Sequence, residues 1–234
     1  MKLTEHLFGY AWQGRANNCN SYLLKGSRTV LFDPGHIYNE LRESCLEMLT
    51  RQMTADGIDL AEIDLVLCTH GHPDHFEAAG IIREKSGALF GIHQGDQFIL
   101  DYMAERQATQ TGSKMPSLKP DFYLEEGGLD LNAGSGHNSQ DDRIQVLHTP
   151  GHSPGCVCFY LPDHQALISG DTIFEGSIGR SDLPGGNMDT LGQSVEKLSQ
   201  LNGVNYLLPG HMGHVQGATN IKRNFDQIKR YFFS

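Results

Sequence analysis

The stretch THGHPDH, residues 69–75, places three imidazoles and a carboxylate within one short turn. Neutral imidazole nitrogens and carboxylate oxygens are the ligands that zinc and other borderline divalent ions prefer, whereas structural zinc sites more often use cysteine thiolates. A lone histidine here would be explained by solvation, but four clustered ligands favour a catalytic metal site. The candidate ligands are His70, His72, Asp74 and His75.

The residues that flank this motif predict where it lies. The apolar run from Ile63 to Cys68 is typical of a buried strand. Gly71 allows a tight backbone path, and Pro73 fixes its own φ angle. We therefore expect a stiff loop at the carboxyl end of a strand, and such loops commonly carry functional residues.

Further ligands must come from elsewhere, because four ligands on one loop cannot all reach a single ion with tetrahedral geometry. Three downstream residues each follow an apolar run and a turn rich in glycine or proline. They are His152 in HTPGHSPG, Asp171 in LISGDTIF and His211 in YLLPGH.

Taken in order, HGHPDH, TPGHSPG, SGDTIF and LPGH resemble the metal-binding motifs of the metallo-β-lactamase superfamily, and the resemblance spans nearly the whole chain. The stretch FEGSIGRSDLPGGNMDTL is similar to the thioesterase branch, the hydroxyacylglutathione hydrolases (glyoxalase II) and their short bacterial relatives. The resemblance implies an α/β (α+β) fold, a four-layer αββα sandwich of two packed mixed β-sheets flanked by helices.

Carried over residue by residue, the resemblance implies two divalent metal ions, with zinc expected and iron or manganese as alternatives. A metal-bridging hydroxide is then the expected nucleophile. We also expect Asp74 and Asp171 to be catalytic. The implied assignment gives one ion His70, His72 and His152, gives the other Asp74, His75 and His211, and makes Asp171 the bridge.

The chemistry favours a small-molecule thioester as the substrate. A water held between two divalent cations loses a proton near neutral pH, so no serine or cysteine nucleophile is required. A metal can neutralise the oxyanion, and a thiol with a pKa of about 8.5 leaves without a general acid. The hydroxyacylglutathione type is expected, although the short stretch after His211 is too small for the helical glutathione-binding domain of longer relatives.

Arg180, in the turn GSIGR, is the candidate substrate-binding residue. Guanidinium binds carboxylate in a bidentate manner, so this side chain could contact an anionic substrate. A surface salt bridge is the other interpretation. Asp33, in LFDPG, is interpreted as a turn residue that supports the metal loop and not as a ligand.

Composition narrows the class of protein. With 234 residues and 38% hydrophobic content, the chain is expected to form one domain, 1–234. A net charge of −10 argues against a nucleic-acid partner. We see no membrane-spanning run and no secretory signal, so a cytoplasmic location is expected. The five cysteines are scattered and odd in number, which indicates reduced core residues. The oligomeric state cannot be inferred.

Two other functions fit the same residues. In an iron persulfide dioxygenase, His70, His152 and Asp171 would form the facial triad of non-haem iron. A noncatalytic metal-binding module is the second alternative. Metal quantification together with a thioester assay would distinguish the three.

Local patterns predict most of the remaining elements. A helix is expected where Leu41, Cys45, Met48, Leu49 and Met53 fall at helical spacing, with Asn39 as its cap. Another is expected over residues 95–106, and a solvated loop that could act as a lid over 109–142. In the last helix Ile221, Phe225, Ile228 and Phe232 are expected to face inward. His36, His93, His148 and His214 are placed near the cleft mouth, and His6, His137 and His164 are expected to be exposed.

Overall fold

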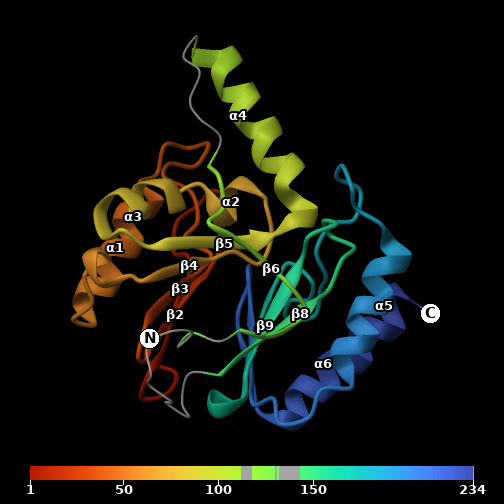
Figure 1. Cartoon of the computed structure of the whole chain (residues 1–234). Helices are drawn as coiled ribbons and strands as arrows, with labels where there is room; N and C mark the ends of the chain where they lie inside the picture. Colours follow the sequence, from red (N-terminus) through yellow and green to blue (C-terminus); the bar gives the residue numbers. More distant parts are fainter. Residues whose placement is uncertain (112–117, 130, 132–142, 234) are drawn as a thin grey trace.

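The computed structural model describes residues 1–111, 118–129, 131 and 143–233. Its first six-stranded sheet comes from the part of the chain up to Leu124 (Figure 1). In sheet order the strands are β1 (Leu7–Tyr10), β2 (Ser21–Lys25), β3 (Thr29–Phe32), β4 (Leu65–Leu67), β5 (Leu89–His93) and β6 (Phe122–Leu124).

The second six-stranded sheet comes from the C-terminal half. In sheet order its strands are β12 (Val215–Gln216), β11 (Tyr206–Pro209), β10 (Ala166–Gly170), β9 (Val157–Leu161), β8 (Ile144–His148) and β7 (Gly127–Leu129). Both sheets are mixed: β3 to β6 run parallel in the first, and β10 and β11 run parallel in the second.

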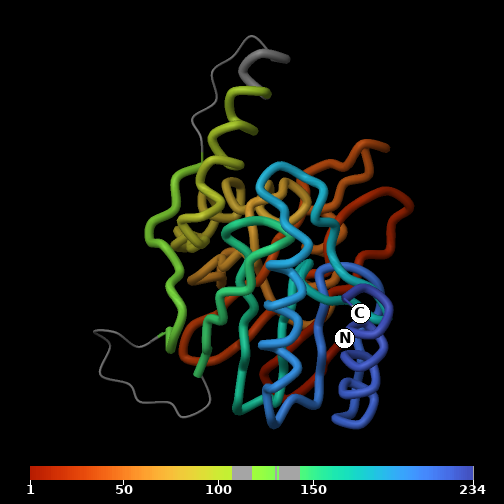
Figure 2. Tube along the Cα trace, turned by 90° about the vertical axis from the view of Figure 1, so that its right-hand side faces the viewer, coloured from red at the N-terminus to blue at the C-terminus, as the bar shows by residue number. Residues whose placement is uncertain are grey.

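Helices cover the outer faces of both sheets (Figure 1). The helices α1 (Cys45–Ala55) and α3 (Ala79–Ser86) lie against the first sheet, and α5 (Met188–Ser199) and α6 (Ala218–Phe232) against the second. The predicted αββα sandwich is confirmed. The helix α4 (Gln97–Thr111) extends away from the sandwich (Figure 2). No helix in the described part of the chain is long and apolar enough to cross a membrane.

The largest buried side chains explain why the two sheets pack together. Strand residues that face the other sheet form one apolar cluster, in which the rings of Phe32 and Phe159 lie 5.0 Å apart. Both rings are fully buried. Truncation of such a core phenylalanine to alanine costs about 3–5 kcal/mol of stability, so contacts of this kind hold the two halves of the site in register.

The carboxyl ends of the parallel strands determine the position of the site. Asp33 follows β3, Thr69 follows β4 and Asp96 follows β5 by a short 3₁₀ turn (Gln94–Asp96). In the second sheet Asp171 follows β10, and His211 follows β11. Because parallel strands end at the same edge of a sheet, these residues gather at one rim of the sandwich.

The structure corrects the expected start of the first helix. The helix α1 begins at Cys45, with Ser44 at its N-cap, and Asn39 instead accepts hydrogen bonds from the amides of Leu41 and Glu43 in the preceding turn. Arg42 has a φ of 58°, which interrupts any helix there. As a result Leu41 is 55% exposed and lies outside the helix.

Three other expectations need correction or restriction. Phe232 is 38% exposed rather than inward, whereas His164 is 9% exposed and its Nδ1 lies 2.8 Å from Oγ1 of Thr4. The stretch 109–142 contains the end of α4 and the strands β6 and β7. Residues 112–117, 130 and 132–142 of this expected loop, with His137, lie outside the described residues.

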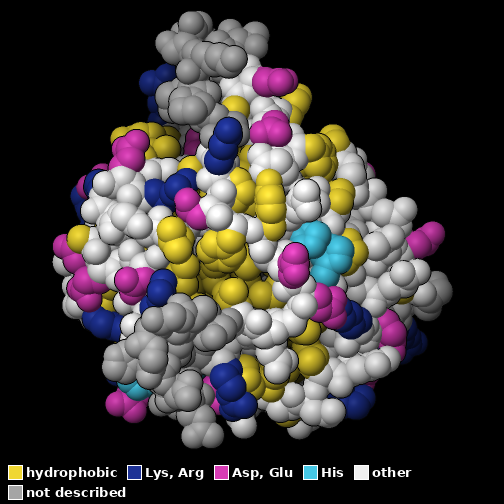
Figure 3. Space-filling model, in the orientation of Figure 1, with side chains coloured by type: hydrophobic (Ala, Val, Ile, Leu, Met, Phe, Trp, Pro, Cys, Tyr) yellow, Lys and Arg dark blue, Asp and Glu magenta, His cyan; other side chains and the backbone are white. Residues whose placement is uncertain are grey.

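Acidic and basic side chains are interspersed over the face shown in Figure 3. With the net charge of −10, this distribution is unlike the continuous basic surface that binds a nucleic-acid backbone.

Candidate metal centre

The loop from Thr69 to His75 turns its side chains into the rim of the sandwich. His70 and His75 are fully buried and Asp74 is nearly so, while His72 is half-buried. His72 is the N-cap of the short helix α2 (Pro73–Phe76), whose first residue is a proline with a fixed φ angle. The loop therefore presents its side chains from a backbone that has little freedom.

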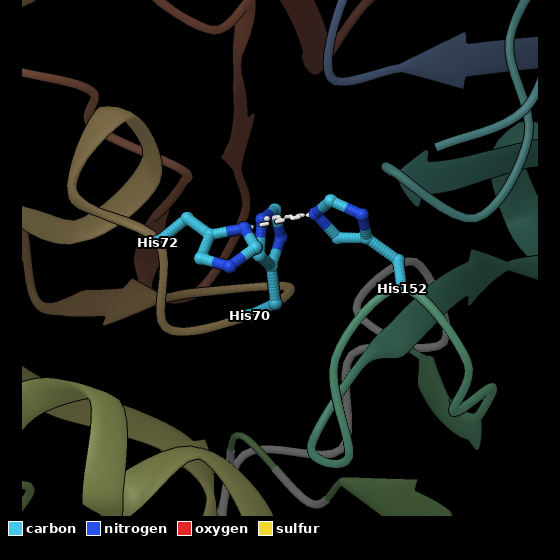
Figure 4. Close-up of side chains that lie close together, drawn as sticks. All are labelled: His70, His72 and His152. Atoms are coloured by element: carbon cyan, nitrogen blue, oxygen red, sulfur yellow. Dashed lines mark hydrogen bonds between the residues drawn. The ribbon is translucent and has the colours of Figure 1, made fainter. Parts of the chain in front are cut away.

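The first group of converging side chains is His70, His72 and His152. Nε2 of His152 lies 2.9 Å from Nδ1 of His72 and 3.2 Å from Nε2 of His70. Figure 4 shows the three imidazoles pointing toward a common position from two separate loops. His152 belongs to the loop that follows β8, so this group joins the two sheets.

The hydrogen bonds behind these rings indicate which nitrogens carry lone pairs. Nδ1 of His152 lies 2.5 Å from the carbonyl oxygen of Arg180, which can only accept, so Nε2 of His152 is unprotonated in the neutral ring. The Thr69 hydroxyl donates to Asp33 and so accepts from Nδ1 of His70, which leaves Nε2 of His70 unprotonated as well. Two facing lone pairs suit a shared cation, so these residues fit a divalent metal ion.

The second group is Asp74, His75 and His211. Nε2 of His211 lies 3.3 Å from Oδ2 of Asp74 and 3.4 Å from Nε2 of His75. Nδ1 of His75 lies 3.0 Å from Oδ2 of Asp33, which orients the other ring nitrogen toward the group. This set of two imidazoles and a carboxylate also fits a divalent ion.

Asp171 lies between the two groups. Its Oδ2 is 3.6 Å from Nε2 of His152 and 3.5 Å from Nε2 of His211, and its Oδ1 is 3.3 Å from Nε2 of His75. A Cβ on Gly210 would come within 2.4 Å of Oδ1, so glycine is needed there. Oδ1 is buried without a hydrogen-bond partner in the described structure, which is costly for a carboxylate unless a cation is present.

The protonation states of Asp171 and His72 also suit the binding of metal cations. Burial raises the pKa of Asp171, but His75 and His211 outweigh it and hold that pKa well below its usual range. Burial lowers the pKa of His72 to about 4, and the neighbouring His152 adds to this effect. At neutral pH the carboxylate is ionised and the His72 imidazole is neutral, as metal ligands must be. Burial lowers the pKa of His211, but Asp171 and Asp74 outweigh it and raise that pKa to about 9, and the pKa of His75 is raised as well, so a bound ion would displace a proton from each of these two rings.

Asp33 supports the site, as the sequence interpretation expected. Its carboxylate accepts from the amide and hydroxyl of Thr69 and contacts His75, and it is fully buried. Its φ of 50° is in the left-handed region, where aspartate is tolerated better than most residues. Asp33 therefore holds the strand end and one imidazole in place.

Two residues at the site were missed by sequence reasoning. Asn17 donates its side-chain amide to Oδ2 of Asp74 at 2.8 Å. Asp96 is fully buried and accepts hydrogen bonds from the loop that carries His70 and His72 and from the loop that carries His152. Asp96 did carry a signal, because it closely follows a strand in the same way as Asp33 and Asp171. Asn17 lies in a polar turn with no comparable pattern.

The remaining histidines engage partners outside the cluster. His93 and His148 stack on each other with ring centroids 4.2 Å apart, and His36 lies 2.7 Å from a carboxylate oxygen of Glu77. His214 is exposed. None of these four belongs to a candidate metal group among the described residues.

The side chain of Arg180 makes two 2.9 Å contacts with Asp182, and both residues are largely exposed. Its backbone carbonyl meets His152. All five cysteines are free and buried, as expected for reduced core residues.

The αββα sandwich carries a histidine and aspartate cluster at its strand ends that could hold metal ions. The chain belongs to the metallo-beta-lactamase superfamily, whose family model matches residues 14–211. It is 36% identical over 200 residues to the "Probable metallo-hydrolase YqgX" of Bacillus subtilis, and the match covers 81% of this chain and 82% of that protein. It is 33% identical over 159 residues to the "Hydroxyacylglutathione hydrolase GloC" of Haemophilus influenzae, covering 65% and 72% of the two chains.

Solved structures share the fold. The structure of TTHA1623 "in a di-iron-bound form" is 30% identical, with a TM-score of 0.66 and coverage of 92% of this chain and 93% of that one. ETHE1 from Myxococcus xanthus matches with a TM-score of 0.62 at 23% identity and covers 90% of this chain and 80% of that one. The second likeness shows the fold alone.

Proposed function

We propose that this protein is a binuclear metallohydrolase that cleaves small-molecule thioesters of the hydroxyacylglutathione type. The observation that carries the proposal is the position of Asp171, within 3.6 Å of imidazole nitrogens in both ligand groups. A carboxylate so placed can serve two ions. The relative named as a hydroxyacylglutathione hydrolase supports the choice of substrate.

When bound, two divalent ions would supply a hydroxide at neutral pH and positive charge beside the substrate carbonyl. The chain prepares the ligands for this. The Arg180 carbonyl and Asp33 each hold an Nδ1 proton, on His152 and His75, and so direct the Nε2 lone pairs into the site.

A thioester suits this set of residues because its leaving group needs little help. A thiol has a pKa of about 8.5 and departs as a thiolate without a proton donor, unlike an amine or an alkoxide. The two carboxylates, Asp74 and Asp171, do not fully neutralise two divalent ions, so a loaded site favours an anionic substrate. We place Arg180 at the substrate, where it would exchange Asp182 for a substrate carboxylate.

The second candidate is a mononuclear iron persulfide dioxygenase. The observation that favours it is that Nε2 of His152 lies 3.2 Å from Nε2 of His70 and 3.6 Å from Oδ2 of Asp171, so the three ligands of a facial triad lie close together. The second group, Asp74, His75 and His211, has no role in that reaction. Its presence is the reason to prefer the binuclear hydrolase.

Elemental quantification of the purified protein, paired with assays on S-lactoylglutathione and glutathione persulfide, tests the proposal. We expect two metals per chain, thioester cleavage and no oxygen consumption, with cleavage abolished in His72→Ala. One iron per chain with oxygen consumption would favour the dioxygenase. Tight metal binding without turnover of any thioester, lactone or phosphodiester would identify a noncatalytic module.

A further inference from the structure

Asp96 connects the two loops that carry the first ligand group. The carboxylate lies at the end of the 3₁₀ turn after β5 and is fully inaccessible to solvent. Its Oδ2 accepts from the amide of Gly71 at 2.8 Å and from the hydroxyl of Ser153 at 2.6 Å. Its Oδ1 accepts from the amide of Gly155 at 2.6 Å.

The positions of these donors relate Asp96 to the metal ligands. Gly71 lies between His70 and His72 in the loop after β4, which belongs to the first sheet. Ser153 directly follows His152 in the loop after β8, which belongs to the second sheet. One carboxylate therefore ties together the backbone segments that supply all members of the first group.

The packing around this carboxylate leaves little room for adjustment. A Cβ on Gly71 would lie 2.9 Å from the Cβ of Asp96, and a Cβ on Gly155 would lie 2.6 Å from its Cγ. Only glycine allows both loops to approach so closely. Charge-assisted hydrogen bonds to backbone amides are short and strong, so the loop separation is held at the value that the carboxylate requires.

We propose that Asp96 is a positioning residue that sets the distance between His152 and the His70–His72 pair, and so determines the affinity of the first metal position. The inference rests on the proposed metal binding. Asp33 contacts His75 of the second group directly and reaches the first group only through Thr69 and His70, whereas the hydrogen bonds of Asp96 go to the loops of the first group alone. Loss of Asp96 should therefore affect the two ions unequally.

A purely structural role is the competing explanation, because any buried carboxylate with satisfied donors contributes to stability. The two explanations differ in what a substitution changes. A structural role lowers the free energy of unfolding and leaves the metal affinities of the folded protein alone. A positioning role changes one metal affinity in protein that is still folded.

The test is a competition titration of Zn²⁺ against a chromophoric chelator, applied to the wild type and to Asp96→Asn. The amide keeps the size of the side chain but loses its charge and turns an N–H group toward amide donors. We expect the affinity for one of two Zn²⁺ ions to fall by about 10- to 100-fold and the other to change little. Replacement by Co²⁺ should show an altered absorption spectrum for one ion.

Asp121→Asn is the control for the loss of an aspartate that accepts a backbone amide; unlike Asp96, Asp121 is exposed. Asp121 accepts hydrogen bonds from the backbone amide of Phe90 at 2.8 Å and from the side chain of Arg83. It lies toward the opposite end of β5 from Asp96. We expect this variant to lose stability while keeping both Zn²⁺ affinities. Ser153→Ala removes a single donor and should weaken the same ion by a smaller factor.

Wild-type Zn²⁺ affinities in Asp96→Asn, or equal losses at both positions, would overturn the positioning role. If Asp96→Asn does not fold, Ser153→Ala decides: unchanged affinities there would also overturn it. A wild-type protein that binds two Zn²⁺ but cleaves no thioester would refute the proposed function alone, and one that binds no Zn²⁺ would refute both.

Discussion

Oδ2 of Asp33 lies 3.0 Å from Nδ1 of His75, and both side chains are closed to solvent. This contact orients the imidazole and directs its Nε2 toward Asp74, Asp171 and His211. Burial lowers the pKa of His75, but Asp33 and Asp171 outweigh burial and hold it well above its usual range. Asp33 therefore interacts strongly with His75, which is a member of the second ligand group.

Asp33→Asn should reduce kcat/KM for the thioester by about 10- to 100-fold, because the second ligand group loses the acceptor that orients His75. Steady-state kinetics with metal-replete protein measure the effect. Asp121→Asn serves as the control for an aspartate away from the site that also accepts a backbone amide. Kinetics like those of the wild type would show that His75 does not need Asp33.

Asp171→Ala should lower the content of both metals, because one carboxylate contacts imidazoles of both groups. Elemental analysis after gel filtration in metal-free buffer measures this. Loss of one ion with full retention of the other would mean that Asp171 belongs to a single group.

Arg180→Ala should raise KM by about 10- to 100-fold and leave kcat nearly unchanged, because it removes a charged donor pair for a substrate carboxylate. The backbone carbonyl that meets His152 is retained in this variant. Asp182→Ala is the companion variant: it frees the guanidinium and should not raise KM. An unchanged KM in Arg180→Ala would leave the arginine as a surface ion-pair partner.

Metal removal should lower the melting temperature. Ligand present at 100 times its dissociation constant stabilises the folded state by about 2.7 kcal/mol. For a chain of this size that corresponds to a shift of roughly 5–10 °C. Differential scanning calorimetry before and after dialysis against a chelator measures the shift, and re-addition of Zn²⁺ should reverse it. Identical melting curves would contradict the metal assignment.

Glu43 predicts a pH-dependent contribution to stability. Hydrogen bonds from Asn39 and from the amides of Ala16 and Arg15 lower the pKa of its carboxyl to about 2. Because the pKa of Glu43 is lowered on folding, its contribution to stability is complete at pH values well above about 4.3, the usual pKa of glutamate. This contribution is lost as the pH falls toward 2.

Glu43→Gln should therefore lower the free energy of unfolding at neutral pH and differ progressively less from the wild type in acid. Urea unfolding across this range measures both. A difference that stays constant with pH would show that the charge of Glu43 is not involved.

Local patterns in the sequence were sufficient for the strands that end at the site and for the residues at those ends. The apolar run before His70 and the runs before His152, Asp171 and His211 each became a strand with the residue just beyond it. The patterning of a strand and the chemistry of the turn after it are both short-range signals, since they depend on neighbouring residues. The αββα arrangement followed from the family resemblance of the motifs.

Other local predictions failed where a turn competed with periodicity. Leu41 lies at helical spacing from Cys45, but the hydrogen bonds of Asn39 and the left-handed Arg42 form a turn there instead. For Arg180 the sequence left substrate binding and a surface salt bridge open, and the structure identifies Asp182 as its ion-pair partner.

The sequence by itself determined the types of the candidate ligands, their order and their places at strand ends. Only the tertiary structure decided which side chains meet, because packing one sheet on the other joins residues that are far apart in the chain. Asp96 and Ser153 are separated by 57 positions and still share a 2.6 Å hydrogen bond. No local pattern encodes such a contact, since it depends on how both sheets twist and pack around their common core.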